Sequence, residues 1–125
     1  MHAKQTVLAF WQAMQSNDFA SASLFLSPDF EGYWPQSGEL ILGRENFVAI
    51  NSKYPTQGKW QFEIHSVVCE GEQVVTDVSV TDGKQKARAI TFHTVQDGLI
   101  SQQKEFWPDP MPALEWRAKW VSVIK

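Results

Sequence analysis

Three acidic–glycine pairs between Trp60 and Trp107 constrain this chain more than any other feature. They are Glu70-Gly71, Asp82-Gly83 and Asp97-Gly98, and the runs that they separate are rich in Val, Ile, Thr, Phe and Trp. Tight hairpin turns need a positive φ, which glycine adopts at little cost. β-Branched and aromatic residues favour strands. The stretch is therefore predicted to form four consecutive antiparallel strands.

The residues before this stretch show helical spacing. Val7, Phe10, Trp11 and Met14 lie at i, i+3, i+4 and i+7, which predicts a helix over about 4–16. A shorter helix is expected after Asn17-Asp18, and a third helix between Gly43 and Pro55. Short strands are expected at 30–34 and 40–42. Helices followed by a meander predict an α+β domain with the helices on one face of a bent sheet.

The segment after Trp107 begins with a proline-rich connector. A short tail helix is predicted over 113–121, with Trp116 and Trp120 at i and i+4. These two indoles would expose a large apolar patch if the tail were free. The tail is therefore expected to dock onto the body.

Length, charge and cysteine content limit the class of protein. At 125 residues, the chain is expected to form a single domain over 1–125. A net charge of −3 argues against nucleic acid or an anionic membrane as a partner. A lone cysteine, no signal-peptide pattern and no membrane-length apolar run favour a cytoplasmic location. Histidine spacing and glycine pattern indicate no metal and no cofactor.

Strand alternation divides the polar side chains between two faces. Val75, Asp77 and Ser79 share one face of their strand; Ala89, Thr91 and His93 share one face of the next; Gln103, Glu105 and Trp107 share one face of the last. Parity alone does not say which face meets the helices. A plain interpretation puts Val74, Val78, Ile90 and Phe92 inside and leaves the acids in water.

Several short motifs, taken in order, carry a family resemblance over nearly the full length. They are Phe10-Trp11, Asn17-Asp18, Gly43-Arg44-Glu45, and Asp97-Gly98-Leu-Ile100 followed by Lys104-Glu105-Phe106-Trp107. The chain resembles the nuclear-transport-factor-2-like superfamily, which includes SnoaL-like polyketide cyclases, limonene-epoxide-hydrolase-like enzymes and ketosteroid isomerases. The resemblance implies a cone: a curved antiparallel or mixed sheet with three N-terminal helices over its concave face, enclosing a pocket.

The resemblance also assigns the faces. It turns Asp77, His93 and Glu105 into the pocket. It leaves a convex apolar face, which a second subunit is expected to cover in a homodimer, formed by Val74, Val78, Val80, Ile90 and Phe92.

The implied catalytic residues match only in part. Glu105 resembles the last-strand acid/base of the cyclases and epoxide hydrolases, and Asp77 resembles the hydrolases' strand aspartate. The arginine that accompanies this aspartate falls on Val75. The ketosteroid isomerases' acid/base positions fall near Trp34, Phe10 and Thr91, which disfavours their chemistry.

If Asp77 and Glu105 lie on one wall of the pocket, each shifts the pKa of the other, so that one can donate a proton and the other can accept one. His93 would adjust the pKa values of this pair or act as a base itself. The alternative is that the acids are ordinary solvated or salt-bridged strand residues and that His93 is only hydrogen-bonded.

Aromatic residues suggest the ligand. Six tryptophans are many for this length, and large aromatic surfaces suit a flat apolar molecule. For Trp11 a core role is favoured over the pocket. The expected lining residues are Trp11, Trp34, Tyr54, Trp60, Thr91, Gln103 and Trp107.

Two functional hypotheses follow. The first is a cofactor-independent acid/base enzyme that cyclises, isomerises or hydrolyses an apolar cyclic compound. The second is a non-catalytic ligand-binding or dimeric accessory module of the same fold. The acid pair favours the first, and the missing arginine favours the second.

Overall fold

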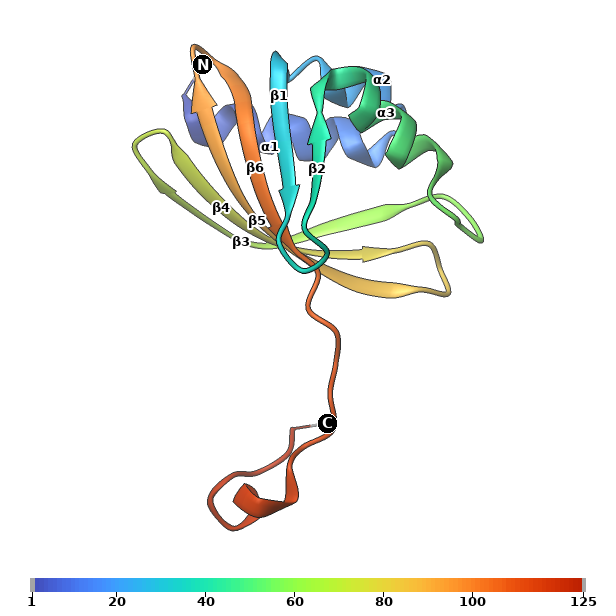
Figure 1. Ribbon diagram of the computed structural model, residues 1–125, viewed down its shortest axis with the longest axis vertical. Helices are drawn as coiled ribbons and strands as arrows, with labels where there is room; N and C mark the ends of the chain where they lie inside the picture. The colour runs from blue at the N-terminus through green and yellow to red at the C-terminus, as the bar shows by residue number, and fades with distance from the viewer. Residues whose placement is uncertain (1, 125) are drawn as a thin grey trace.

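The computed structural model describes residues 2–124, and its centre is one curved six-stranded sheet with the helices on one face (Figure 1). The spatial order is β2-β1-β6-β5-β4-β3. β1 and β6 run parallel, and every other neighbouring pair runs antiparallel. The predicted α+β class with a mixed sheet is confirmed. The strands are β1 Leu26–Trp34, β2 Glu39–Leu42, β3 Gln61–Glu70, β4 Gln73–Thr81, β5 Lys86–Gln96 and β6 Leu99–Phe106.

The predicted meander is confirmed as β3 to β6. At the β5–β6 turn, Asp97 and Gly98 have φ values of 53° and 77°. Two successive residues with positive φ match the twist of the flanking strands. Gly71 and Gly83 have positive φ at the two earlier turns.

Three helices, α1 Ala3–Gln15, α2 Phe19–Ser23 and α3 Gly43–Lys53, cover the concave face. The first two have side-chain caps. The ring of His2 accepts the Lys4 N–H, and the Asp18 carboxylate accepts the Ser21 N–H. Satisfying these amides favours helix initiation at those residues. No helix within residues 2–124 is long and apolar enough to span a bilayer.

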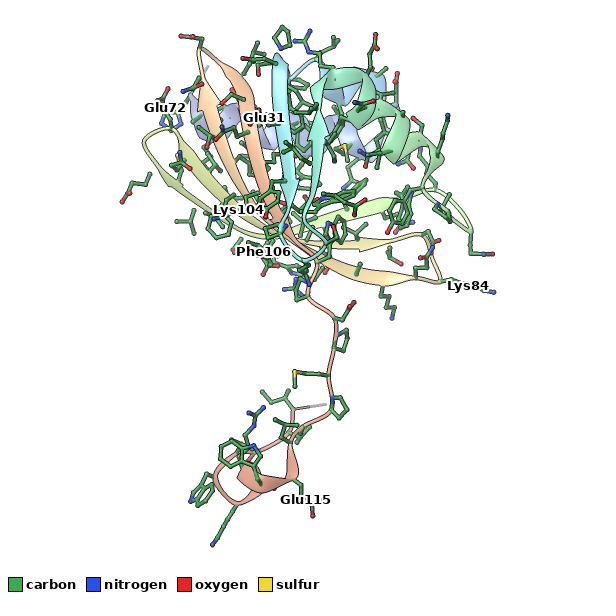
Figure 2. All side chains as sticks on the ribbon, viewed as in Figure 1. Glu31, Glu72, Lys84, Lys104, Phe106 and Glu115 are labelled. Atoms are coloured by element: carbon green, nitrogen blue, oxygen red, sulfur yellow. The ribbon has the colours of Figure 1, made fainter. Side chains whose placement is uncertain are left out.

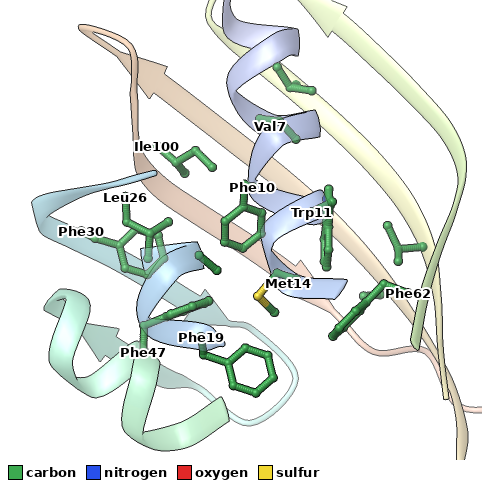
Figure 3. Packing of buried hydrophobic residues seen from close by; sticks show 14 of the residues in the cluster. Val7, Phe10, Trp11, Met14, Phe19, Leu26, Phe30, Phe47, Phe62 and Ile100 are labelled. Atoms are coloured by element: carbon green, nitrogen blue, oxygen red, sulfur yellow. The ribbon is translucent and has the colours of Figure 1, made fainter. Parts of the chain in front are cut away.

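The core fills the space between α1 and the sheet (Figure 3). Phe10, Trp11 and Met14 turn toward the strands, as the helical spacing predicts. The Phe10 ring lies 5.2 Å from the Trp11 ring and 5.9 Å from the Phe47 ring of α3, measured between centroids. Such contacts add to the burial energy of the rings. The concave face is thus largely packed and is not an open cavity.

The prediction for the face of β4 is wrong. β4 pairs with β5 so that Val74 lies opposite His93, Thr76 opposite Thr91, and Val78 opposite Ala89. Opposite residues of an antiparallel pair share a face. Val74, Val78 and Val80 are consequently buried on the helix side. Of the five residues assigned to the convex face, only Ile90 and Phe92 lie there.

A β-bulge in β6 changes a second assignment. Val95 pairs with Ile100 but Thr94 pairs with Gln102, so Ser101 is an extra residue. The extra residue brings Ile100 onto the same face as Gln103. Ile100 is fully buried, whereas simple alternation would place it on the face opposite Gln103 and Glu105.

The predicted tail helix is present as a short 3-10 helix, but its predicted docking onto the body is wrong. The chain leaves the body after β6 and forms a single 3-10 helix, η1 Glu115–Trp120 (Figure 1). No residue of η1 is buried, and Trp116 and Trp120 are 73% and 71% exposed. We call residues 108–124 the C-terminal arm.

Candidate functional site

Glu105 is the carboxylate that the fold places on the concave side, at the end of β6. Its Oε1 accepts hydrogen bonds from the indole Nε1 of Trp34 at 3.1 Å and of Trp107 at 3.0 Å. Its Oε2 accepts a hydrogen bond from the Thr91 hydroxyl at 2.6 Å. A carboxylate has about four acceptor positions. Three are therefore used, and one position on Oε2 stays available for a proton.

Burial raises the pKa of Glu105 above the ordinary value of a glutamate, and the three hydrogen bonds oppose this rise. The ion pairs found within residues 2–124 do not involve Glu105. A buried carboxylate without a cation holds its proton more readily. A raised pKa makes the carboxyl group a weaker acid and its carboxylate a stronger base, which favours proton transfer in both directions.

Replacing Thr91 by Val is expected to raise the pKa of Glu105 further, because the hydroxyl hydrogen bond stabilises the ionised form. Side-chain carboxyl NMR of the wild type and of Thr91→Val measures the shift directly. Asp77→Asn is the matched control, because Asp77 lies on the other face and should leave the Glu105 titration unchanged. A Thr91→Val titration identical to that of the wild type would contradict the assignment.

His93 is part of a buried hydrogen-bond chain. Its Nε2 lies 2.9 Å from the Thr76 hydroxyl oxygen, and its Nδ1 lies 3.1 Å from the Gln103 amide nitrogen. The Trp11 indole donates to the Thr76 hydroxyl at 3.2 Å. Burial lowers the pKa of His93 to about 3, so the ring is neutral at physiological pH. The hydrogen-bonded alternative for His93 therefore fits better than an acid/base role.

Asp77 does not join Glu105, and this corrects the paired-carboxylate prediction. Its partner in β5 is Ile90, which places both on the convex face. Arg88 binds it there through Nε to Oδ1 at 2.5 Å and Nη2 to Oδ2 at 3.0 Å. The Arg88 hydrogen bond lowers the pKa of Asp77. Asp77 is thus the salt-bridged strand carboxylate of the alternative interpretation.

An aromatic chamber of about 270 Å³ opens at the end of the sheet from which the arm departs. Tyr54, Trp60, Phe62 and Trp107 supply its aromatic lining, with Asn51, Gln85, Lys86 and Asp109 among its polar residues. Tyr54 and Trp60 meet edge to face with centroids 6.1 Å apart. A second hollow of about 320 Å³ shares Tyr54, Trp107 and Asp109, and adds Trp34.

Two polar anchors fix the walls of this aromatic chamber. The Asn17 amide accepts the Trp60 N–H and donates to the Trp60 carbonyl, both at 2.8 Å. Asp82 accepts the backbone N–H groups of Gln57, Lys84 and Gln85, which holds the pKa of its carboxyl far below its usual range. Buried polar atoms with complete hydrogen bonding favour one loop conformation.

Glu105 itself faces a much smaller cavity, of about 30 Å³. Trp34 lines both this cavity and the second hollow, so its indole separates the carboxylate from the outer space. A volume of about 15 Å³ admits one water, so the resting cavity has no room for an organic ring. Access to Glu105 therefore needs the Trp34 side chain to move.

The other predicted lining residues divide between the pocket and the core. Trp34, Tyr54, Trp60 and Trp107 line the outer spaces. Trp11 is 3% exposed, and its favoured core role is confirmed. Thr91 and Gln103 are buried and bind Glu105 and His93, and Gln103 also lines the small cavity beside Glu105.

Asn51 is a lining residue that sequence reasoning missed. It lines both the chamber and the cavity beside Glu105, and its amide donates to the Phe47 carbonyl at 2.9 Å. It lies four residues after Phe47 on α3, hence on the same helix face. The i, i+4 spacing from Phe47 is the sequence signal that could have placed Asn51 beside the pocket. Within residues 2–124, no three His, Cys, Asp or Glu side chains gather to hold a metal ion.

A curved mixed sheet that holds three helices, with the partly buried carboxylate of Glu105 at its open end, defines a small domain of the nuclear-transport-factor-2-like kind. A SnoaL-like domain matches residues 7–103. The chain therefore belongs to the SnoaL-like domain family. No curated protein matches it.

Solved structures support the fold. A candidate ketosteroid isomerase from Kribbella flavida DSM 17836 is 24% identical, with a TM-score of 0.90 over 98% of this chain and 90% of that one. An NTF2-like protein of unknown function from Burkholderia xenovorans LB400 is 29% identical, with a TM-score of 0.81 over 98% and 95%. An LEH-like epoxide hydrolase of M. tuberculosis is 21% identical, with a TM-score of 0.68 over 85% and 82%.

Proposed function

We propose that this protein binds a small, flat, apolar molecule in the aromatic chamber and that Glu105 moves a proton on it without a cofactor. The observation that carries the proposal is the environment of Glu105. It is a carboxylate with a raised pKa, three neutral donors, no ion-pair partner within residues 2–124 and one open acceptor position. These are the properties of a general base for a weakly acidic C–H bond.

One carboxylate supports a one-base reaction. Oε2 takes a proton from carbon and becomes the hydroxyl of the neutral acid, while the C–H electron pair passes into an enolate. Return of the proton to another carbon isomerises the molecule. Attack of the enolate carbon on an internal carbonyl cyclises it, and the new alkoxide takes the proton from Glu105. Epoxide hydrolysis receives less support for two reasons. Asp77 binds Arg88 on the convex face, and Val75 stands at the position of the arginine that accompanies this aspartate in the hydrolases.

The walls indicate the ligand class. Four aromatic side chains surround a volume of about 270 Å³, slightly below the range of about 300–1,000 Å³ for ligand pockets. Asn51, Gln85 and Lys86 lie at its border and could orient one carbonyl group. A compact ring system with one polar oxygen fits this lining. Binding is expected to displace the Trp34 indole, which lies between the adjoining second hollow and the cavity beside Glu105.

The test uses 2-tetralone, a flat bicyclic ketone with acidic C–H bonds. Tryptophan fluorescence quenching measures its binding, and proton NMR in D₂O measures exchange of its α-hydrogens. We expect saturable quenching, together with exchange faster than in buffer at the same pH. Absence of both would overturn the proposed ligand class, and binding without exchange would overturn the proposed chemistry.

A non-catalytic binding module is the second candidate, favoured by one observation. The cavity beside Glu105 measures only about 30 Å³, and Glu105 ties the indoles of Trp34 and Trp107 together. In this alternative, Glu105 only braces two walls of the aromatic chamber. The alternative predicts binding of 2-tetralone with no exchange above the buffer rate.

A further inference from the structure

The C-terminal arm carries an unusual amount of unpartnered apolar surface. Single exposed apolar residues are normal on a protein surface, but clusters mark interaction sites. Figure 2 shows side chains of the arm, around Glu115, far from the body. The large exposed apolar residues of the arm are Met111, Leu114, Trp116, Trp120, Val121, Val123 and Ile124.

The connector directs the arm away from its own body. Prolines occupy positions 108, 110 and 112. Each proline fixes its own φ and keeps the preceding residue extended. A connector of this kind is a stiff spacer. It opposes the sharp reversal that would lay Trp116 and Trp120 on the sheet from which the chain has just emerged.

The convex face of the sheet offers a complementary surface. Apolar side chains from four strands are exposed there, and we call them the convex row: Leu40, Tyr33, Phe92 and Val68. A groove of about 410 Å³ runs beside Leu40, Tyr33 and Phe92. Lys104 lies between Tyr33 and Phe92 in the same row, with its ammonium group 5.0 Å from the centre of the Phe92 ring, so the groove also has a cationic lining residue.

We propose that two copies of this chain exchange their arms, so that the arm of each copy lies on the convex row of the other. Each copy supplies one arm and one convex row. A two-fold axis between the copies therefore places each arm on the convex row of the other copy at the same time. An arm of 17 residues reaches up to about 55 Å when extended, and six strands span about 25–30 Å. The arm is therefore long enough to cross the whole sheet of its partner.

The area is sufficient for a stable dimer. A buried tryptophan removes about 150–250 Å² from water. The two arms carry four tryptophans between them, which alone account for roughly 600–1,000 Å². The other apolar residues of the arms and the convex rows that they cover bring the total into the range of about 1,200–2,000 Å² for specific interfaces.

Sedimentation velocity at micromolar concentration tests the exchange. The arm variant is Trp116→Ser/Trp120→Ser, and the face variant is Phe92→Arg, with Val68→Arg as a second choice if Phe92→Arg does not fold. Leu24→Ser is the matched control, because Leu24 is 65% exposed at the end of α2, away from the convex row. We expect the wild type and Leu24→Ser to sediment as dimers, and the arm and face variants as folded monomers.

Mixing the two variants separates arm exchange from other arrangements. The mixture retains one good arm and one good convex row, so part of the material should return to the dimer. A monomeric wild type would overturn the proposal and point to docking within one chain. An arm variant that stays dimeric would also overturn it, since the faces would then associate without arms, and so would a mixture without dimer. None of these variants alters the site around Glu105.

Discussion

Glu105→Gln should reduce proton exchange on 2-tetralone to the buffer rate. Glutamine keeps the shape of the side chain and can still accept from the indoles of Trp34 and Trp107, but it cannot take a proton from carbon. A positioned general base contributes about 10²–10⁴ in rate, so a loss of that size is expected. Proton NMR in D₂O measures it, with an unchanged thermal transition as evidence that the fold is intact.

Asp77→Asn is the matched control for this loss. It removes one strand carboxylate of the same sheet, but one that binds Arg88 on the convex face. The exchange rate of Asp77→Asn is expected to equal that of the wild type. Exchange that survives in Glu105→Gln, or that fails equally in Asp77→Asn, would contradict the role of Glu105.

Acid should destabilise the protein through His93. The unfolded ring has an ordinary pKa near 6.5, whereas burial lowers the folded value to about 3. Between these values the unfolded state binds more protons, so stability falls as the pH falls. Each pH unit costs about 1.4 kcal/mol for one proton, and the whole window amounts to about 4–5 kcal/mol. The free energy of unfolding, measured by urea titration from pH 7 to pH 3.5, should show this slope.

His93→Gln should remove that slope, since an amide can replace the contacts to Thr76 and Gln103 but does not titrate. Glu105 acts with the opposite sign, because its raised pKa lowers stability as the pH rises above the unfolded value. The difference between wild type and His93→Gln at each pH cancels this contribution. His65→Gln is the matched control, because it makes the same substitution at an exposed histidine outside the buried chain. A His93→Gln variant with the full wild-type slope would contradict the account.

Local sequence chemistry was enough to predict the meander, but not which face of the sheet Glu105 occupies. Asp97-Gly98 supplies the two positive φ values that a tight turn needs, which makes its hairpin predictable. The inward position of Glu105 and Trp107 came from the family resemblance. The bulge at Ser101 left no such signal, and it moved Ile100 into the core.

Asp77 was misplaced although the sequence contained the information to place it. Thr81 pairs with Lys86 across a four-residue connection, which sets Asp77 opposite Ile90. A two-residue turn at Asp82-Gly83 would leave Asp77 on the same face as Ile90, and opposite to His93. The hairpin parity thus excluded a shared pocket for Asp77 and His93 in either case.

Hydrophobic alternation gave contradictory signals on neighbouring strands. It correctly predicts Val74 and Val78 as inward in β4, but it incorrectly predicts Ile90 and Phe92 as inward in β5. The reason is that β5 buries the polar Thr91 and His93, whose hydrogen bonds are satisfied by Glu105, Thr76 and Gln103. The partners of a buried polar residue come from other strands, so a single strand does not reveal them.

A crystal structure with bound 2-tetralone is the most direct test of the central claim, that Glu105 is the proton-transfer group of an aromatic pocket. The account predicts the ring between Tyr54, Trp60 and Trp107, with the Trp34 indole displaced. It also predicts an acidic carbon within about 3.5 Å of Glu105 Oε2. Density for the ketone on the convex face, or in the aromatic chamber with Trp34 still between its acidic carbon and Glu105, would contradict the claim.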